Sequence, residues 1–438
     1  MNLSKPKNPN YAATVVVIKT LVQLENCDNV QAAIILGNQV IVSKEVKIGD
    51  VGIYFPLECQ LSPVYLAQNN LYSRKELNRD NTQRGYFDVN GRIRCQKFRG
   101  HKSEGLFMPI TSISDFLDED NDLYIGDEFD TLNGNLICSK YVVKTRTHDS
   151  STDKKGRKYK KLESKVIDNQ FRFHDDTSML YKNLHKINPN DLISITYKLH
   201  GTSGISSYVL CKKKISWIEK LLLKLGVDVK TEDYDYIYSS RKVIKNPELN
   251  PNAVHFYENN IWGMAHKEVE SFLQKGMAFY YEIVGYLPNG GNIQKDYDYG
   301  CEPDTFKVYI YRITHTNIDG KVMEYSAKQV QDFCKKNGLN AVPELYYGKA
   351  SNFYDVKILG RKKSLDFEDK WKKTFLEQIK ERYNEKNCYM CKNTVPEEGC
   401  VIRIEELGFE AYKVKSNAFY ERETVLLDKG ESNIEEEN

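Results

Sequence analysis

Short strand-like segments fill the first quarter of this chain and constrain its fold more than any other feature. Five or six runs rich in β-branched and aromatic residues lie at 12–24, 31–35, 39–43, 52–55, 85–89 and 92–98. Two turn signals separate them, Gly37-Asn38 and Asn90-Gly91. Asn-Gly between alternating apolar residues is a strong hairpin signal, because both turn positions need positive φ. With one polar insertion at 66–81, this pattern is typical of a small closed barrel such as an OB-fold.

From about residue 171 onward, strand and helix signals alternate. Strands are predicted at 192–197, 204–211, 279–285, 306–313, 399–404 and 411–414. One helix is predicted over 217–225, where the apolar residues fall on a single helical face. A second is predicted to begin after Ser326, with a capping box to Gln329, and to end at Gly338. In a third, over 367–383, aromatic and aliphatic residues spaced by four indicate a core face.

Length and composition exclude several classes of protein. At about 150 residues per domain, 438 residues predict two or three domains. The chain is 40% hydrophobic and 28% charged, which excludes a disordered or fibrous protein. It contains no apolar run of the ~18–20 residues that a membrane span needs, and residues 1–10 lack the apolar core of a secretory signal. We therefore expect a soluble, intracellular protein, cytoplasmic or nuclear, with no membrane partner.

Charge is nearly balanced overall, with 63 basic and 61 acidic residues, so net charge does not indicate a nucleic-acid partner. One stretch differs: residues 140–165 carry ten Lys or Arg against three Asp or Glu. A solvated hinge between domains and an arm that follows a phosphate backbone both explain this stretch.

Ten scattered cysteines indicate reduced thiols rather than a disulfide framework. Cys388 and Cys391 have the spacing of a zinc or redox pair. No second such pair and no matching His pair accompanies them, so paired surface thiols are the favoured interpretation.

A set of clusters, each placed on or beside a predicted strand, carries the candidate chemistry. They lie at 197–203, 239–242, 281–285, 306–312, 398–403 and 413–415. Taken singly, each has an ordinary explanation. Lys198 can be a strand-end lysine, Glu282 and Glu398 can be members of buried ion pairs, and either Tyr309 or Tyr311 can be core. Their order along the chain is what needs a common explanation.

This ordered set resembles the covalent nucleotidyltransferases, the superfamily of polynucleotide ligases and mRNA capping enzymes. Lys198-x-x-Gly201 is similar to their nucleotidyl-lysine motif, with Thr202 at the place typical of RNA ligases. His200 stands where many ligases carry Asp, a departure that phage-type RNA ligases share. Tyr197 stands where a polar residue often reads adenine, which leaves nucleotide selectivity open.

The later clusters fit the same superfamily. Glu282 falls in its third motif, Tyr311 in the aromatic motif that stacks on adenine, and Glu398 in the fourth motif. Lys413-x-Lys415 is similar to the fifth.

The N-terminal segment narrows the resemblance to the family 5 ATP-dependent RNA ligases, over about residues 10–420. The supporting segments are GIYFP, NNLY, a GYFD-NGRIR hairpin and a G-x-x-SEG segment. The resemblance implies an α+β chain: an OB-fold β-barrel over 1–138, a basic hinge over 139–170, a nucleotidyltransferase domain of antiparallel sheets flanked by helices over 171–425, and an acidic tail over 426–438. It also implies a monomer that uses ATP with Mg²⁺ or Mn²⁺ to seal nicks whose 3′-OH strand is RNA, in duplexes that include RNA/DNA hybrids.

The residues themselves are compatible with that chemistry. To attack phosphorus, Lys198 must be neutral, although a free lysine has a pKa of ~10.4. Burial and nearby cations, for which Lys413 and Lys415 are candidates, would lower that pKa. Residues i and i+2 of one strand point the same way, so these two lysines would face the phosphates together. Glu282 and Glu398 are the candidate ligands of the metal ion, directly or through water.

Further contacts are expected around the nucleotide. Tyr311 would stack on adenine, Gly201 would let the backbone approach the nucleotide, and Arg241 would hold the ribose or a strand phosphate. His200 is expected to contact the AMP phosphate. In the barrel, the predicted hairpin offers basic residues to RNA, with a solvated strand face as the commoner explanation: Arg92, Arg94 and Lys97.

Two other classes stay open. A DNA ligase or a capping guanylyltransferase would use the same lysine, and a capping enzyme would transfer GMP rather than AMP. A nucleic-acid-binding protein with a decayed catalytic domain is the alternative that is not an enzyme; the intact motif residues count against it.

Overall fold

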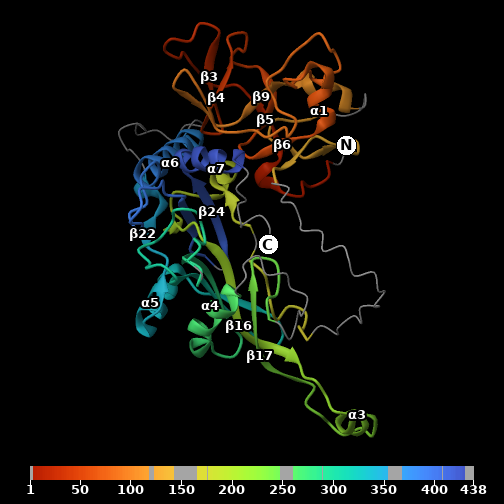
Figure 1. The fold of residues 1–438 in the computed structure, drawn as a ribbon, viewed down its shortest axis with the longest axis vertical. Helices are drawn as coiled ribbons and strands as arrows, with labels where there is room; N and C mark the ends of the chain where they lie inside the picture. Colours follow the sequence, from red (N-terminus) through yellow and green to blue (C-terminus); the bar gives the residue numbers. More distant parts are fainter. Residues whose placement is uncertain are drawn as a thin grey trace.

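The computed structural model describes residues 3–117, 123–142, 165–174, 176–246, 260–288, 290–353, 367–406 and 408–429. Figure 1 shows an N-terminal lobe at one end of the molecule, a larger lobe built on two sheets below it, and a long hairpin reaching away from both. No helix among the described residues has the length and apolar character needed to cross a membrane.

The N-terminal lobe consists of several small antiparallel sheets. One four-stranded sheet has the order β10-β1-β5-β9, made of Glu128–Phe129, Ala13–Val17, Val51–Phe55 and Leu106–Pro109. A second has the order β2-β3-β4, made of Leu21–Val22, Val30–Ile35 and Asn38–Ser43. The remaining pairs are β6 with β13 (Cys59–Leu61, Cys138–Lys140), β7 with β8 (Gln96–Phe98, His101–Ser103) and β11 with β12 (Thr131–Leu132, Asn135–Leu136). Helix α1 spans Pro63–Gln68.

In the described part of the lobe, these strands do not join into one closed ring of hydrogen bonds, so the expected closed barrel is wrong in that detail. The chain leaves the first sheet at Pro56, which has no N–H to donate, and β6 then pairs with β13 instead. The lobe still buries one apolar core, to which Ile53, Phe55 and Phe129 contribute.

Hairpin positions differ from the prediction in two places. The β3–β4 turn is Leu36-Gly37, both with positive φ, and Asn38 already pairs with Ile35 as the first residue of β4. The predicted hairpin at Asn90-Gly91 does form a turn, since Gly91 has a φ of 62°. However, the strand after that turn pairs elsewhere: the hairpin is β7–β8, closed by residues 99 and 100.

The larger lobe packs two sheets against each other and against helices. The first sheet has the order β14-β24-β23-β15-β22, made of Ser178–Met179, Glu410–Lys415, Gly399–Ile404, Leu192–Lys198 and Glu344–Lys349. The second has the order β17-β16-β18-β19-β20, made of Glu232–Ser240, Thr202–Lys212, Met277–Gly285, Phe306–Thr316 and Val322–Glu324, and β21 (Asn340–Ala341) pairs with β19. Most pairs are antiparallel, as expected; β14–β24 and β19–β21 are parallel.

The helices of this lobe are α2 to α7, which span Leu180–Asn183, Trp217–Lys224, Ile261–Val269, Ala327–Asn337, Phe367–Tyr383 and Asn417–Asp428. Helix α5 has the predicted capping box between Ser326 and Gln329 and ends at Gly338 with a φ of 68°. The predicted core face of α6 is also confirmed, because Trp371, Phe375 and Ile379 are buried against the first sheet. The chain is thus α+β, with its second lobe built as antiparallel sheets flanked by helices.

Ion pairs join the two lobes along α7. Arg94 pairs with Asp428 at 2.9 Å, and Lys97 pairs with Glu421 at 2.9 Å. Arg92 is buried and makes a bidentate pair with Glu58 inside the N-terminal lobe. The expected surface of Arg92, Arg94 and Lys97 is therefore occupied by carboxylates.

Candidate active site

Three neighbouring strands bring the central motif residues into one row. Lys198 at the end of β15 lies opposite Gly399 of β23, which lies opposite Lys415 of β24. Glu398 precedes Gly399, and its carboxylate lies 2.7 Å from the Lys198 Nζ and 3.1 Å from the Lys415 Nζ. This glutamate is fully buried between the two cations. Three motif residues spread over more than 200 residues of sequence thus meet at one carboxylate.

Gly399 makes this close row possible. Its φ of 135° lies in the region that favours glycine, and a Cβ there would stand 2.0 Å from the carbonyl oxygen of Val414. A side chain at this position would push β23 and β24 apart, and with them Glu398 and Lys415.

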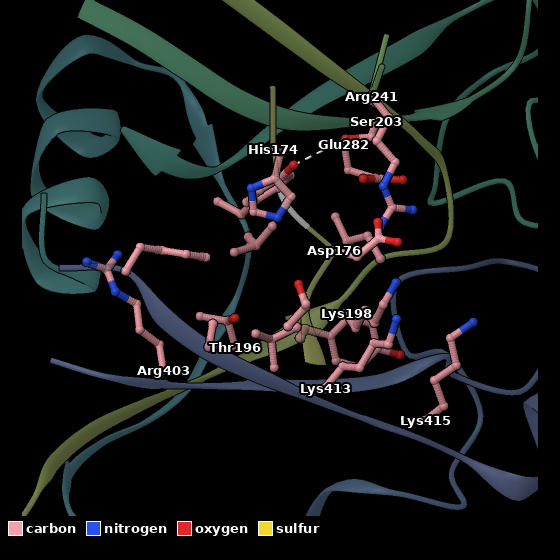
Figure 2. A pocket seen from close by; sticks show the side chains of 18 of the residues that line it. His174, Asp176, Thr196, Lys198, Ser203, Arg241, Glu282, Arg403, Lys413 and Lys415 are labelled. Carbon is pink, nitrogen blue, oxygen red and sulfur yellow. Dashed lines mark hydrogen bonds and ion pairs between the residues drawn. The ribbon is translucent and has the colours of Figure 1, made fainter. Parts of the chain in front are cut away.

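The same sheet forms one wall of a cavity. Because side chains alternate across a strand, β15 sends Thr196 and Lys198 into the cavity, β23 sends Arg403, and β24 sends Lys413 and Lys415. Figure 2 shows the three lysines together on this wall. The cavity has about 1370 Å³ of free space including its mouth, which is room for a nucleotide.

The second sheet forms the opposite wall. Ser203, Glu282, Tyr311 and Arg241 line it, and Figure 2 shows the side chains of Ser203, Glu282 and Arg241 facing the lysine wall. The Tyr311 hydroxyl lies 3.2 Å from the Ser203 hydroxyl. Of the two candidate tyrosines of β19, Tyr311 lines the cavity and Tyr309 does not. The structure thereby distinguishes two positions that the sequence left equivalent.

A short turn after Lys198 carries the chain from β15 on one wall to β16 on the other. A Cβ on Gly201 would stand 2.2 Å from the Ile283 carbonyl oxygen, so only glycine fits this crossing. The Gly201 N–H donates to Glu282 at 3.2 Å, and the Gln294 amide donates to the Gly201 carbonyl at 2.7 Å. Glu282 therefore holds the turn that positions the lysine, in addition to lining the cavity.

His200 sits within this turn rather than on the cavity wall. Its N–H donates to the Tyr299 hydroxyl at 2.6 Å, and its ring packs edge-on against Tyr297 and Phe419. Its Nδ1 lies 3.9 Å from Glu398. The ring thus lies beside Glu398, and the expected contact of His200 with the AMP phosphate stays a prediction.

Electrostatics inside the cavity are dominated by cations. Burial, followed by the charges of Lys415 and Lys198, lowers the pKa of Lys413 to about 7. Burial and the charge of Arg312 place the pKa of His174 well below its ordinary value, so this imidazole is neutral near pH 7. The lowered pKa values of Lys413 and His174 show that the cavity has an excess of positive charge. An anionic ligand such as a polyphosphate would neutralise that excess.

Several cavity residues were missed by the sequence reasoning. Asp176 forms an ion pair with Arg241, and His174 packs edge-on against Tyr311. Both lie on the segment between the lobes, where no motif marks them. Arg403 belongs to the cluster at 398–403 but was given no role there. It is 5% exposed and lines the cavity, and its Nε and Nη1 have no hydrogen-bond partner among the described residues. Its place at the end of that cluster was the available signal.

The N-terminal lobe also contributes to the cavity. Tyr11, Glu58 and Lys140 line it beside Lys415 and Glu423. The cavity therefore extends from the two sheets to the contact between the lobes.

No cluster of three or more His, Cys, Asp or Glu side chains able to hold a metal ion occurs among the described residues. Glu282 lines the cavity, and Glu398 contacts two of the lysines that line it. Both offer carboxylate oxygens, the ligands that Mg²⁺ and Mn²⁺ prefer. Because Mg²⁺ commonly uses one or two carboxylates together with substrate phosphates and water, these two residues fit a metal that arrives with a nucleotide.

Tyr197 lies between the cavity and the cysteine pair. It lines the cavity wall, and its ring packs edge-on against Tyr389, with centroids 5.1 Å apart. A hydrogen bond from the Cys391 thiol lowers the pKa of Cys388 to about 6. Cys388 is buried and Cys391 half-buried, so the expectation of surface thiols is wrong.

Comparisons with known proteins agree with this architecture. A family model described as an OB-fold domain matches residues 12–110. No curated protein matches the chain. Among solved structures, a mutant of Naegleria gruberi RNA ligase with AMP and Mn is similar at 16% identity and a TM-score of 0.56, over 94% of this chain and 98% of that one.

Two further structures of the same ligase are similar to this chain. A mutant with ATP and Mn is 15% identical with a TM-score of 0.56, over 95% of this chain and 99% of that one. The ligase with PPi is 18% identical with a TM-score of 0.54, over 94% of this chain and 98% of that one. The chain thus has an N-terminal OB-fold domain and shares its overall fold with an RNA ligase.

Proposed function

We propose that this protein is an ATP-dependent RNA ligase in which Lys198 carries AMP. The observation that carries the proposal is the row of Lys198, Glu398 and Lys415 at the base of a cation-rich cavity. The relatives in fold support it, since their structures were obtained with ATP, AMP, PPi and Mn. ATP is the substrate, and PPi a product, of a reaction that places AMP on a lysine.

The first step forms a phosphoramidate. The Lys198 Nζ loses a proton, for which the Glu398 carboxylate at 2.7 Å is an available acceptor, and attacks the α-phosphorus of ATP. The N–P bond forms as the bond between the α-phosphorus and the bridging oxygen breaks, which releases pyrophosphate. Lys413 and Lys415 face the reacting phosphates and would stabilise the charge that develops there.

Two more steps seal the strand. A 5′-phosphate oxygen of the donor strand attacks the adenylyl phosphorus, so the N–P bond to Lys198 breaks and an AMP-capped end (AppN) forms. The 3′-OH of the acceptor strand then attacks the capped 5′-phosphate and AMP leaves. Each step is a phosphoryl transfer, for which positioning and charge stabilisation supply most of the catalysis.

The other cavity residues have roles in binding. Tyr311 would stack on adenine, and Gly201 keeps the turn close to the nucleotide. Arg241 would hold the ribose or a strand phosphate once it exchanges its partner Asp176 for that ligand. Tyr197 would contribute backbone contacts to the nucleotide rather than read the base with its hydroxyl.

A divalent metal ion would be held by Glu282 and Glu398 together with phosphate oxygens and water, and it would neutralise charge on the phosphates. Glu398 already binds Lys198 and Lys415, so the two lysines and the metal ion would share its carboxylate. Glu282 would keep its hydrogen bond from Gly201 through its other oxygen.

We propose nicked duplexes with an RNA 3′-OH strand as the substrate, including RNA/DNA hybrids, sealed by a monomer inside the cell. The OB-fold lobe would contact the strands, because OB-folds bind single strands through basic and aromatic residues. Arg94 and Lys97 would be available for that contact only when the lobes separate, since α7 carboxylates bind them in this arrangement.

Labelling with ATP tests the proposal. The protein is incubated with Mn²⁺ and α-labelled ATP or GTP, and label on the protein is measured after denaturing electrophoresis. We expect label from ATP, none from GTP, and none in Lys198→Ala, while the exposed control Lys321→Ala labels like the parent. Equal labelling of Lys198→Ala would contradict the proposal, and transfer of GMP would indicate a capping enzyme instead.

A sealing assay tests the substrate. Nicked duplexes that differ only in an RNA or DNA 3′-OH strand are compared for joining and for AMP-capped intermediate. We expect joining with the RNA 3′-OH strand. Efficient joining of the all-DNA nick would instead favour a DNA ligase.

A further inference from the structure

The hairpin β16–β17 projects from the larger lobe and carries helix α3 at its end (Figure 1). The two strands stay paired along their whole length, from Gly204 with Ser240 to Lys212 with Glu232. At ~3.3 Å per residue, the nine residues from Ser203 to Lys212 place this end about 30 Å from the cavity. We call residues 212–230 the hairpin tip. It lies far from any group that the proposed chemistry uses.

Apolar side chains on the hairpin tip face solvent. Trp217 is 75% exposed and Leu225 70% exposed, and Ile218 and Leu221 are each about half exposed. These four residues lie on one face of α3, since their spacing follows the helical repeat. No residue of α3 is buried, so no described part of the chain covers this face. The sequence predicted the helix and its apolar face correctly, but this face lies outside the core.

Lysines border the apolar face. The tip holds six lysines against two acidic residues. Lys220 and Lys224 follow Trp217 and Leu221 by three residues, so they lie beside that face on the next turn. Lys214, Lys220 and Lys224 make no ion pair with any residue that the structure describes, whereas Lys213 pairs with Glu219.

We propose that the hairpin tip is a binding site for a membrane surface that contains anionic lipids. A short helix with Trp and Leu on one face and lysines along its edge matches what an interfacial helix presents to such a surface. The apolar side chains would enter the boundary between headgroups and acyl chains. The unpaired lysines would bind the anionic headgroups.

The shape of the site favours a lipid surface over the other classes of partner. The tip is the end of a projection, so a flat surface can reach it without contact with the rest of the protein. Nucleic acid would use the lysines and Trp217, but it would leave the aliphatic side chains of Ile218, Leu221 and Leu225 without a partner. A lipid surface with anionic headgroups supplies both the negative charge and the apolar burial that this face needs.

Vesicle sedimentation with the full chain tests this proposal. The probes are vesicles of phosphatidylcholine alone and of phosphatidylcholine with about 30% phosphatidylserine. We expect binding to the second kind, reduced at least about tenfold by Trp217→Ala combined with Leu221→Ala, and reduced by raised salt. Lys220→Glu combined with Lys224→Glu is expected to weaken binding as strongly. Ile48→Ala combined with Ile318→Ala removes exposed apolar side chains elsewhere and is the matched control, with binding unchanged.

Three results would overturn the proposal. One is no binding to anionic vesicles, and another is binding that the tip variants do not change. The third is loss of self-association or of RNA binding in the tip variants while lipid binding stays as in the parent, which would identify a second copy or RNA as the occupant. Adenylylation with ATP serves as the folding control, since the tip lies away from the cavity. A tip variant that labels like the parent and loses vesicle binding supports the proposal.

Discussion

Basic side chains converge in two regions of this molecule, and the way they are balanced differs. Between the lobes, Lys97 and Lys102 share the Glu421 carboxylate, and Arg94 is bound by Asp88 and Asp428. These pairs are partly exposed, at distances of about 3 Å. Each cation there has its counter-charge within the protein.

In the cavity the cations are buried and their counter-charge is shared. Lys198 and Lys415 both approach Glu398, and Lys413 is buried beside them with its pKa lowered to about 7. Exposed, matched pairs contribute little beyond holding two surfaces together, whereas buried like charges are costly unless a ligand compensates them. The difference indicates that the contact between the lobes holds the protein together, whereas the cavity is suited to receive an anion.

The largest expected effect is a difference in labelling rate between variants of Glu398 and Glu421. Each of these glutamates binds two lysines. Glu398→Gln removes the shared charge between Lys198 and Lys415, and it is expected to lower the rate of protein labelling with ATP by about a hundredfold or more. Glu421→Gln does the same between Lys97 and Lys102, and labelling is expected to stay within about twofold. Single-turnover labelling of the two variants measures this contrast, and a similar loss in both would break it.

A medium effect concerns stability as a function of pH. The folded-state pKa of Lys413 is lowered to about 7, whereas the unfolded chain keeps an ordinary lysine value. At a pH between the folded and the unfolded pKa of Lys413, the unfolded state binds more protons than the folded state. The free energy of unfolding therefore rises as pH rises above 7. From pH 6 to pH 9 the gain is on the order of 3 kcal/mol.

Urea unfolding of the parent and of Lys413→Met at several pH values measures this. In the variant the rise is expected to be smaller by about this amount, because methionine does not titrate. The lowered pKa of Cys388 contributes a rise that both proteins share. Parallel pH profiles in the two proteins would show that another group causes the change. The matched replacement Lys97→Met at the contact between the lobes is expected to keep the rise.

The smallest expected effect is at the contact between the lobes. Lys97→Ala removes one partly exposed pair and Arg94→Ala removes two. Each variant is expected to lower the free energy of unfolding by less than about 1 kcal/mol. The loss should shrink further at high salt. A loss several times larger in urea unfolding would mean that this contact depends on buried charge as the cavity does.

Local signals in the sequence were sufficient to predict much of the fold and part of the candidate site. The capping box at Ser326, the strand segments and the order of the motifs depend on neighbours a few residues apart. That Lys198 and Lys415 belong to one site could be predicted, because each lysine ends a recognisable strand. Whether Tyr309 or Tyr311 faces the cavity could not be predicted, because it depends on how the two sheets pack.

The rest depended on contacts between distant parts of the chain. Asp176 lies in no motif, and Arg403 was given no role within its cluster. Both reach the cavity only through the arrangement of the two sheets and the linking segment. Arg94 and Lys97 were candidates for RNA contact, with a solvated strand face as the commoner explanation. Their partners Asp428 and Glu421 lie more than 300 residues further along the chain, so the sequence did not reveal them. The apolar face of α3 has the pattern of a core helix, and periodicity alone does not reveal that a projecting hairpin carries it.

The central claim is that the Lys198 Nζ becomes the carrier of AMP. The most direct measurement is peptide mapping by mass spectrometry after incubation with ATP and Mn²⁺, with the modified lysine located by fragmentation. We expect one AMP on Lys198 and unmodified Lys413 and Lys415. AMP on either of those neighbours, or strand sealing with no modified lysine at all, would contradict it.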